Sequence, residues 1–329
     1  MVEKKFFTFA DLFAGIGGMR FAYESVGGEC VLTSEIDKRA RITYELQEWK
    51  SKHTNHRFVE DVVVLGKMSR EEIPKHDVLL AGFPCQPYSI AGLRQGLEDE
   101  KGRGQVFLSI LDILEKAQPK AFMLENVKGM LSHDGGQTMG FMRNELAKKG
   151  YNVLEPTVLN SMTHGGVPQN RERVFIVGFR NDLGSVNFEF PTQIPLAATL
   201  RDKLEPNDVD PKYFYNHRYG CFVEIEAAVT SFDTAYQWRR KYVRENKSNV
   251  CPALTANMGA GGHNVPLVKV KNGIRKLTPR ECANLQGFPE DFSLPEKMAD
   301  SHLYHQFGNS VTVPLIERIA KNLASALPE

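Results

Sequence analysis

The strongest constraint on the fold is a regular alternation of apolar runs and helical stretches through roughly the first 190 residues. Short runs rich in β-branched and aromatic residues predict strands, and stretches with apolar residues at helical spacing predict helices. The predicted strands cover residues 6–13, 30–34, 78–81 and 121–124, and the predicted helices cover 19–26, 38–49, 106–115 and 137–149. Such alternation is typical of a mostly parallel sheet with helices on both faces, so we expect a Rossmann-like α/β fold.

The chain changes character near Phe190. Between residues 191 and 273, Pro, Gly, Asn and aromatic residues are frequent and helical periodicity is weak. Helical order returns after Arg275, and residues 314–327 predict an amphipathic C-terminal helix. We therefore expect three parts: a first domain over 1–190, a smaller irregular or β-rich domain over 191–273, and a return to the first domain over 274–329.

Composition and charge exclude several classes of protein. The 329 residues are 42% hydrophobic and 25% charged, which is typical of a globular chain and excludes a disordered one. No signal peptide or membrane span is expected, so a cytoplasmic protein is predicted. The five cysteines are widely spaced without a Cys-x-x-Cys pair, so we expect neither a disulfide framework nor a metal site. A formal net charge of +1, taken by itself, argues against a nucleic-acid partner.

Glycines and a carboxylate stand at the ends of the first two predicted strands, where parallel sheets bind ligands. Residues 11–18 (DLFAGIGG) open a helix, and their glycines let a ligand approach the helix N-terminus. The spacing differs from the Gly-x-Gly-x-x-Gly pattern of dinucleotide sites. Glu35 can accept hydrogen bonds from both hydroxyls of a ribose. A cofactor with a ribose but no pyrophosphate suits this pair, and a tight turn without a ligand is the alternative.

A cysteine loop follows the third predicted strand. Residues 82–89 (GFPCQPYS) place Cys85 beside a proline at a strand end, where we expect the thiol to face a cleft. The Gly-rich, charged segment that follows, up to Gly104, resembles a mobile lid. A thiolate is the strongest side-chain nucleophile near neutral pH. Cys85 is therefore a candidate nucleophile, and a structural cysteine in a turn is the alternative.

Five motifs occur in the order found in DNA (cytosine-5) methyltransferases, and the chain resembles a compact bacterial member of the restriction–modification type. The motifs are Phe-x-Gly-x-Gly-Gly at 13–18, Phe-Pro-Cys-Gln at 83–86, Glu-Asn-Val at 125–127, Gln-Asn-Arg-Glu-Arg at 169–173 and Gly-Asn-Ser-Val at 308–311. The resemblance covers almost the whole chain outside 191–273. It implies a catalytic and cofactor-binding domain over 1–190, a target-recognition domain over 191–273, and a hinge and return helix over 274–329.

The resemblance implies methyl transfer from S-adenosylmethionine to carbon 5 of a flipped-out cytosine in duplex DNA, with S-adenosylhomocysteine as product. Cys85 would attack carbon 6, which makes carbon 5 nucleophilic. Glu125 would protonate or hydrogen-bond the ring N3. Arg171 and Arg173, which point the same way on an extended backbone, would hold the base oxygen and orient Glu125. Taken without Cys85, Glu125 could be a helix cap or surface carboxylate, and the arginines a solvated strand edge.

The cofactor contacts implied by the resemblance follow the glycine loop and the neighbouring strand ends. Asp61 would accept a hydrogen bond from the adenine amino group. Ile36 stands where many relatives carry an aromatic residue, so adenine would pack on an aliphatic side chain. The implied set is Phe13, Gly15, Ile16, Gly17, Glu35, Ile36, Asp61, Val62, Pro84, Val106, Asn309 and Val311.

Base flipping costs a few kcal/mol, so contacts elsewhere must offset it. Residues 236–247 carry five basic residues and one acid, a local charge of +4, interleaved with three aromatics. This segment could bind phosphates or base edges, and an amphipathic helix with a solvated basic face is the alternative. The glycine-rich residues 255–262 would let backbone approach DNA. The predicted DNA contacts are Gln86, Ser89, Arg239, Arg240, Thr255, Gly259, Gly261 and Gly262.

Three other functions compete with this one. A tRNA cytosine-5 methyltransferase uses the same scaffold, but Phe83 and the length of 191–273 favour DNA. A catalytically inactive DNA-binding homologue would lack Cys85, Glu125 or the arginines. A nicotinamide-dependent oxidoreductase explains neither the cysteine nor the arginines. We therefore expect a monomer that acts on double-stranded DNA beside a cognate restriction endonuclease.

Overall fold

The structure, a computed structural model, describes residues 6–50, 55–84, 103–206, 209–246, 248–260 and 264–328. Its strands are β1 (Phe7–Leu12), β2 (Gly28–Ser34), β3 (Arg57–Val59), β4 (Val78–Gly82), β5 (Ala121–Val127), β6 (Tyr151–Val153), β7 (Thr157–Asn160), β8 (Gln169–Asn170), β9 (Glu172–Arg180), β10 (Tyr236–Trp238), β11 (Val243–Glu245), β12 (Cys251–Pro252), β13 (Leu267–Val270) and β14 (Gly273–Lys276). Its α-helices are α1 (Gly18–Ser25), α2 (Lys38–Glu45), α3 (Val62–Lys67), α5 (Arg103–Ala117), α6 (Gln137–Lys148), α7 (Ser161–Gly165), α8 (Phe222–Ala228), α9 (Pro279–Gln286), α10 (Asp300–Asn309) and α11 (Val313–Ala326). No helix in these ranges has both the length and the apolar character needed to cross a membrane.

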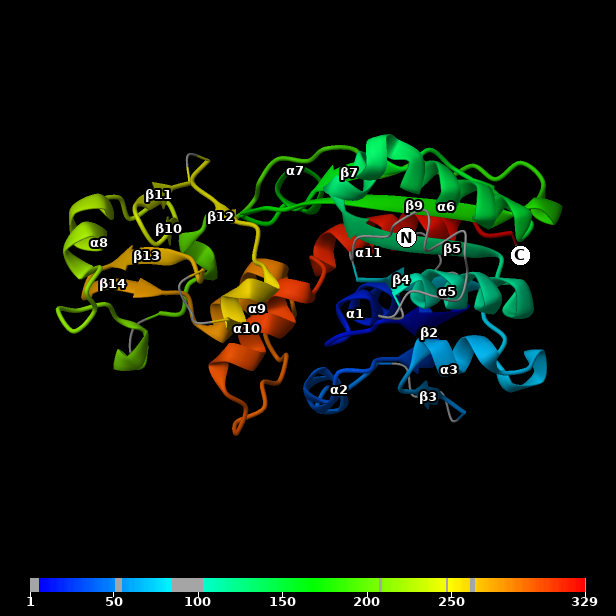
Figure 1. The fold of residues 1–329 in the computed structure, drawn as a ribbon, viewed down its shortest axis with the longest axis horizontal. Coiled ribbons are helices and arrows are strands. Elements are labelled where there is room, and N and C mark those ends of the chain that lie inside the picture. Colours follow the sequence, from blue (N-terminus) through cyan, green and yellow to red (C-terminus); the bar gives the residue numbers. More distant parts are fainter. Residues whose placement is uncertain are drawn as a thin grey trace.

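The larger sheet has the strand order β3-β2-β1-β4-β5-β9-β6, with β7 also paired to β9 (Figure 1). The strands from β3 to β5 are parallel, whereas β9 is antiparallel to β5, and β6 and β7 are antiparallel to β9. The mostly parallel α/β fold predicted from the sequence is confirmed. The carboxyl ends of β1, β2, β4 and β5 meet at one edge of this sheet, where a ligand is expected.

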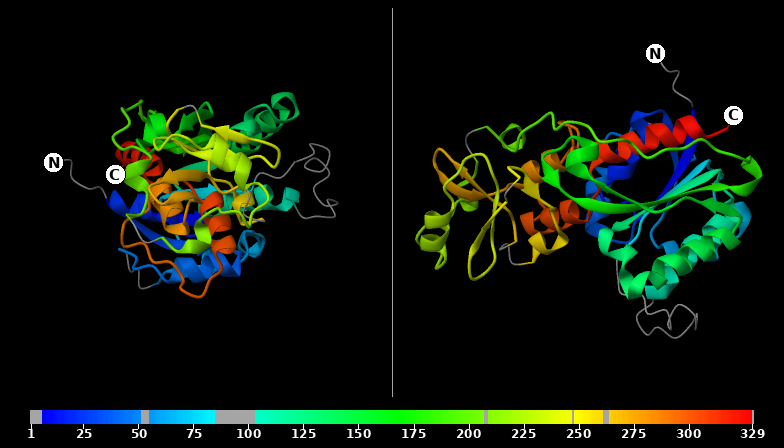
Figure 2. Two further views of the ribbon diagram at one scale, coloured as in Figure 1. Left: turned by 90° about the vertical axis from the view of Figure 1, so that its left-hand side faces the viewer. Right: turned by 90° about the horizontal axis from the view of Figure 1, so that it is seen from above.

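Alternate residues of the central strands face two different helical layers, because successive side chains of a strand point to opposite faces. One layer contains α1 and α11, which pack with Phe9, Leu80 and Met123. The other contains α3, α5 and α6, which pack with Leu79 and Phe122. The C-terminal helix thus lies on the first sheet and covers it beside α1 (Figure 2).

Strand β5 is longer than the sequence predicted. The apolar run suggests an end at Leu124, but β5 continues to Val127 because β9 pairs with it throughout, with Val127 opposite Arg173. Glu125 and Asn126 therefore lie within the strand and not after it. Pairing on both sides of a strand extends it beyond what local residue preference indicates.

Helix α2 is shorter than predicted. The expected helix covers 38–49, but α2 ends at Glu45 and the chain turns back. The Trp49 ring then packs against the ring of Tyr44, with 4.5 Å between the centroids, and covers Gly17 so closely that a Cβ there would lie 2.2 Å from it. Packing of the indole on the glycine loop overrides the local helical preference.

The second sheet is antiparallel, has the order β11-β10-β13-β14, and is drawn to the left of the larger sheet in Figure 1, with α9 and α10 between the two. Together with α8 it encloses a separate small core. The buried members of this core are Ile225, Val229, Tyr236, Leu267 and Ile274. The smaller β-rich part predicted from the sequence is therefore present, and it carries one short helix that the weak periodicity did not indicate.

The basic segment 236–247 contains a β-hairpin, so its interpretation as an amphipathic helix is wrong. β10 and β11 pair antiparallel, with Gln237 opposite Arg244. Tyr236 and Trp238 pack on the small core, and Gln237 and Arg244 project from the other face of the hairpin.

Candidate active site

The glycine loop after β1 has a strained backbone. Phe13, Gly15 and Gly17 have φ angles of 58°, 56° and 87°. A positive φ is unfavourable for phenylalanine, and such strain is concentrated at ligand-binding sites. A Cβ added to Gly15 would meet no atom within 4 Å, so the loop borders open space there. Gly17 is also required by the Trp49 ring that covers it.

Glu35 connects the end of β2 to this loop. One carboxylate oxygen accepts the Gly15 N–H and the other accepts the Asp37 N–H, both at 2.7 Å. Burial raises the pKa of Glu35, and these backbone hydrogen bonds oppose that shift. Each oxygen retains a lone pair, so the carboxylate can still accept two hydroxyl groups. The adjacent Ile36 side chain is 65% exposed, which makes it available to a ligand.

The other predicted cofactor contacts lie in several different environments. Asp61 caps α3 by accepting the Val63 N–H at 2.8 Å, so its carboxylate is held in place at the helix N-terminus. Asn309 donates its side-chain amide to His305 Nε2 at 3.0 Å. Three of the contacts are buried in the core or at its margin, so mainly their backbone atoms can meet a ligand: Ile16, Val62 and Val311. Val106 is half-buried on α5, and Pro84 is exposed. The described residues contain no cluster of three or more His, Cys, Asp or Glu that could hold a metal ion.

Asp11, in β1 directly before the glycine loop, is fully buried. Neither carboxylate oxygen has a hydrogen-bond partner within the described part of the chain. Burial raises the pKa of Asp11 to about 7. The positive charge of Arg20 lowers this pKa, and the negative charge of Glu35 raises it further. The folded protein thus keeps a proton on Asp11 up to about pH 7, whereas an ordinary aspartate releases it near 3.8.

This carboxyl predicts a pH-dependent stability. A raised pKa contributes stability that is complete below the unfolded value and is lost as the pH rises through the folded value. Between pH 5 and pH 8 the free energy of unfolding should fall by about 2–3 kcal/mol on account of this group. Asp11→Asn, which stays neutral, should remove that decrease in urea titrations across the same pH range. The exposed Asp291→Asn serves as control, and equal pH slopes for wild type and Asp11→Asn would refute the assignment.

Glu125 and Arg173 form an ion pair across β5 and β9. The Arg173 Nε lies 3.0 Å from Glu125 Oε1, and both side chains are largely shielded from solvent. Glu125 also lies directly beside Gly82 at the end of β4. The Asn126 side chain donates to the Phe83 carbonyl oxygen at 3.1 Å. β5 therefore holds the strand end that leads to Cys85, and Glu125 is neither a helix cap nor a surface carboxylate.

Arg171 is placed differently from Arg173. It is 1% exposed and donates to the carbonyl oxygens of Leu254 (2.6 Å), Gly308 (3.2 Å) and Ser310 (2.5 Å). Burial, and then the nearby Arg173 charge, lower the pKa of Arg171. The proposal of a solvated strand edge is wrong for this residue. Its contacts join β8–β9 to the chain returning from the second sheet and to the end of α10.

The sequence did not indicate the polar network around Arg171. Gln169 donates to the Leu285 carbonyl oxygen at 2.9 Å and accepts the Leu254 N–H at 3.1 Å. Gln286 donates to the Phe307 carbonyl oxygen at 2.7 Å. Both glutamines are fully buried. The one available signal was that Gln169 begins the same motif as the two arginines.

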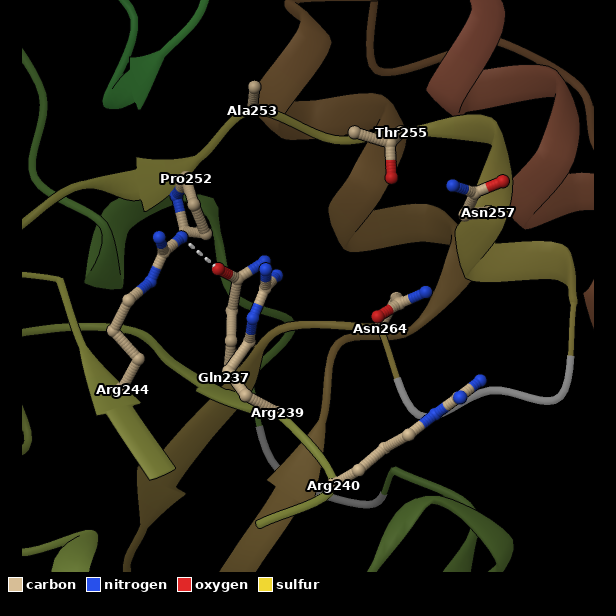
Figure 3. A pocket seen from close by; sticks show the side chains of 9 residues that line it. All are labelled: Gln237, Arg239, Arg240, Arg244, Pro252, Ala253, Thr255, Asn257 and Asn264. Carbon is tan, nitrogen blue, oxygen red and sulfur yellow. Dashed lines mark hydrogen bonds between the residues drawn. The ribbon is translucent and has the colours of Figure 1, made fainter. Parts of the chain in front are cut away.

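A polar hollow of about 610 Å³ opens beside the β10–β11 hairpin (Figure 3). Two of the predicted DNA contacts from the hairpin, Arg239 and Arg240, line it together with Thr255. The sequence did not single out the other polar members. The complete lining is Gln237, Arg239, Arg240, Arg244, Pro252, Ala253, Thr255, Asn257 and Asn264.

Gly259 does not line this hollow, and packing explains why it is glycine. A Cβ there would lie 2.4 Å from the Ser301 carbonyl oxygen and 3.1 Å from His305, because the short 3-10 turn Ala256–Gly259 lies against α10. Contact of Gly259 with DNA stays a prediction. The remaining predicted site residues, Cys85, Gln86, Ser89, Gly261 and Gly262, lie outside the described residues, as does the predicted lid up to residue 102; α5 begins at Arg103.

Comparisons with known proteins point to one family. The family model described as C-5 cytosine-specific DNA methylase matches residues 7–325. The chain is 48% identical to Type II methyltransferase M.Bsp6I of Bacillus sp. (strain RFL6), over 97% of this chain and 98% of that protein. It is 37% identical to Type II methyltransferase M.HpaII of Haemophilus parainfluenzae, over 98% of this chain and 90% of that protein.

Solved structures agree on the fold. The crystal structure of S. pombe Dnmt2 methyltransferase superposes with a TM-score of 0.72 at 19% identity, over 98% of both chains. The structure of Entamoeba histolytica methyltransferase EhMeth superposes with a TM-score of 0.68 at 18% identity, over 98% of this chain and 99% of that one. These similarities extend through both sheets.

Proposed function

The chain belongs to the C-5 cytosine-specific DNA methylases and is a DNA cytosine-5 methyltransferase related to Type II enzymes, and from this premise we propose how it works. It transfers a methyl group from S-adenosylmethionine to carbon 5 of a cytosine flipped out of duplex DNA. The observation that carries the proposal is the Glu125–Arg173 ion pair beside the strand end that leads to Cys85. A proton donor and a cation thereby lie beside the strand end from which the chain continues to Cys85, the proposed nucleophile.

The glycine loop and Glu35 suit a ribose-containing cofactor. Glu35 already fixes the loop through Gly15 and retains lone pairs for the two ribose hydroxyls. The exposed Ile36 offers an apolar surface to adenine, and Asp61 offers a carboxylate to its amino group. When bound, S-adenosylmethionine supplies an electrophilic methyl group.

The reaction begins with attack of the Cys85 thiolate on carbon 6, which forms a C–S bond and moves electron density toward N3. Glu125 donates a proton or hydrogen bond to N3, and Arg173 keeps this carboxyl oriented toward the base. S-adenosylmethionine, held by the glycine loop and Glu35, would supply the methyl group to carbon 5 and would leave as S-adenosylhomocysteine. Loss of the carbon-5 proton to a base and return of the N3 proton to Glu125 then restore the ring and expel the Cys85 thiolate.

Labelled cofactor tests this function directly. The protein should transfer labelled methyl groups to carbon 5 of cytosine in mixed-sequence duplex DNA. Transfer to tRNA alone would replace the proposal by the tRNA-modifying alternative, and no transfer to either would refute it. A duplex with 5-fluorocytosine at the target should trap a covalent adduct, because fluorine cannot leave as a proton does. Cys85→Ser should form no adduct, and an adduct that persists would place the nucleophile elsewhere.

We also propose a revised division of the chain. The target-recognition part continues to Lys276 and not to 273, because β14 pairs with β13 over Gly273–Lys276. The catalytic part comprises 1–190 together with the return segment 277–329, which contains α10 and α11. Duplex DNA is the proposed partner and would contact residues of both parts. We still expect a restriction endonuclease with the same target sequence, a monomeric state and a cytoplasmic location.

A further inference from the structure

The β10–β11 hairpin has the form of an element that reads DNA sequence. The two strands lie at the edge of the second sheet, since β11 is its terminal strand. The major groove of DNA admits a two-stranded ribbon of this kind. The hairpin's apolar face, with Tyr236 and Trp238, is fixed on the small core, so its polar face is presented by a rigid support.

Gln237 and Arg244 form the centre of this polar face. They are opposite one another in the register, and the Arg244 guanidinium donates to the Gln237 side-chain oxygen (Figure 3). Gln237 is 8% exposed, so its side chain is itself held in place. An arginine oriented in this way loses little conformational freedom when it binds, which favours a specific contact over a diffuse one.

Arg240 adds a second, independent observation. It lies in the two-residue turn of the hairpin, closed by the Arg239 N–H to Tyr242 carbonyl bond at 2.8 Å, and has φ 67°. Glycine or asparagine is preferred at such a position. An arginine there has an unfavourable backbone conformation, and strain of this kind is typical of functional positions.

The hollow is lined by three arginines and by amide and hydroxyl groups, and none of its lining residues within the described ranges is acidic. Resting on the proposed function, we propose that Arg244, positioned by Gln237, reads a guanine in the major groove of the target sequence. Two parallel N–H donors of the guanidinium match the O6 and N7 acceptors that guanine alone presents together. Arg240, at the tip, binds the DNA backbone beside it.

Sequencing of methylated cytosines in DNA exposed to each variant tests the proposal. Wild type should give one target motif that contains a guanine, and Arg244→Lys should lose discrimination at that one guanine by roughly 5- to 150-fold. Lysine keeps the charge but lacks the fork, so affinity for phosphate is preserved. The exposed Arg218→Lys, outside the hollow, should keep the motif.

The other outcomes separate the alternatives. An unchanged motif with activity lowered equally at all sites would assign Arg244 to phosphate binding and overturn the proposal. Gln237→Met should relax the same position while the hairpin remains folded, and relaxation of a different position would also overturn it. If wild type methylates no DNA, the proposed function itself fails, and that result is distinct from a change of motif.

Arg240→Gly should separate binding from folding. Glycine accepts a positive φ without strain, so the melting temperature should stay equal or rise. Affinity for target duplex should fall. The slope of log affinity against log salt concentration should become shallower by about one unit, which is the contribution of one phosphate contact. A variant that binds DNA as wild type does would remove Arg240 from the interface.

Discussion

Glu125→Gln is expected to slow methyl transfer by about 10²–10⁴-fold, the range for removal of a positioned acid–base group. The amide has the shape of the carboxylate, and its oxygen can still accept a hydrogen bond from Arg173. It cannot donate a proton to the ring N3 in the same way. Single-turnover kinetics with labelled cofactor should show the loss in the chemical step, and formation of the 5-fluorocytosine adduct should slow in parallel.

Glu172→Gln is a matched control for this variant. Glu172 precedes Arg173 on β9 and pairs with Lys128 at 3.1 Å on the surface. An exposed pair of this kind contributes at most about 1 kcal/mol, so rate and stability should be close to wild type. If Glu125→Gln reacts at the wild-type rate, or if Glu172→Gln is equally slow, Glu125 is not the acid.

The Glu125–Arg173 pair should also act as one unit. If Arg173 works mainly by orienting Glu125, Arg173→Met should lower the rate of methyl transfer almost as much as Glu125→Gln does. The double variant should then be only slightly slower than either single variant. Such non-additivity is expected for residues that share one task. Additive losses would instead give Arg173 a separate contact with the base.

The first sheet could be predicted from the sequence because its strands are buried on both faces. Leu79 and Leu80, for example, are neighbours that face different layers and are both completely buried, so the strand is a continuous apolar run. The second sheet could not be predicted in the same way. Its strands are only three or four residues long, and pairing between distant segments defines them.

The site was predictable where a motif carries chemistry and not where a side chain holds the backbone. Glu125 and Arg173 meet as expected because they lie on adjacent strands. The partners of Arg171 are carbonyl oxygens 83 to 139 residues away, and carbonyl groups leave no mark in a sequence. Residue spacing alone therefore grouped Arg171 with Arg173, although the two guanidinium groups have different contacts.

Arg171→Ala is expected to lower the free energy of unfolding by at least about 3 kcal/mol. The substitution leaves the Leu254 and Gly308 carbonyl groups without their donor, and the Ser310 carbonyl keeps only the 3.4 Å bond from Gln286 Nε2. In a site closed to water each unpaired polar group costs about 1–3 kcal/mol, and the cavity left by the side chain adds to the loss. Urea unfolding at neutral pH measures the loss. Arg143→Ala, which removes a surface pair with Glu155, should cost less than about 1 kcal/mol.

Arg171→Lys distinguishes a positioning role from a catalytic one. Lysine can reach one carbonyl group but cannot span all three, so we expect intermediate stability. Because Leu254 belongs to the recognition side and Ser310 to the catalytic side, loosening their link should raise KM for DNA more than it lowers kcat. If the turnover rate instead fell by roughly two orders of magnitude while stability and KM stayed unchanged, the Arg171 guanidinium would have to contact the reacting base.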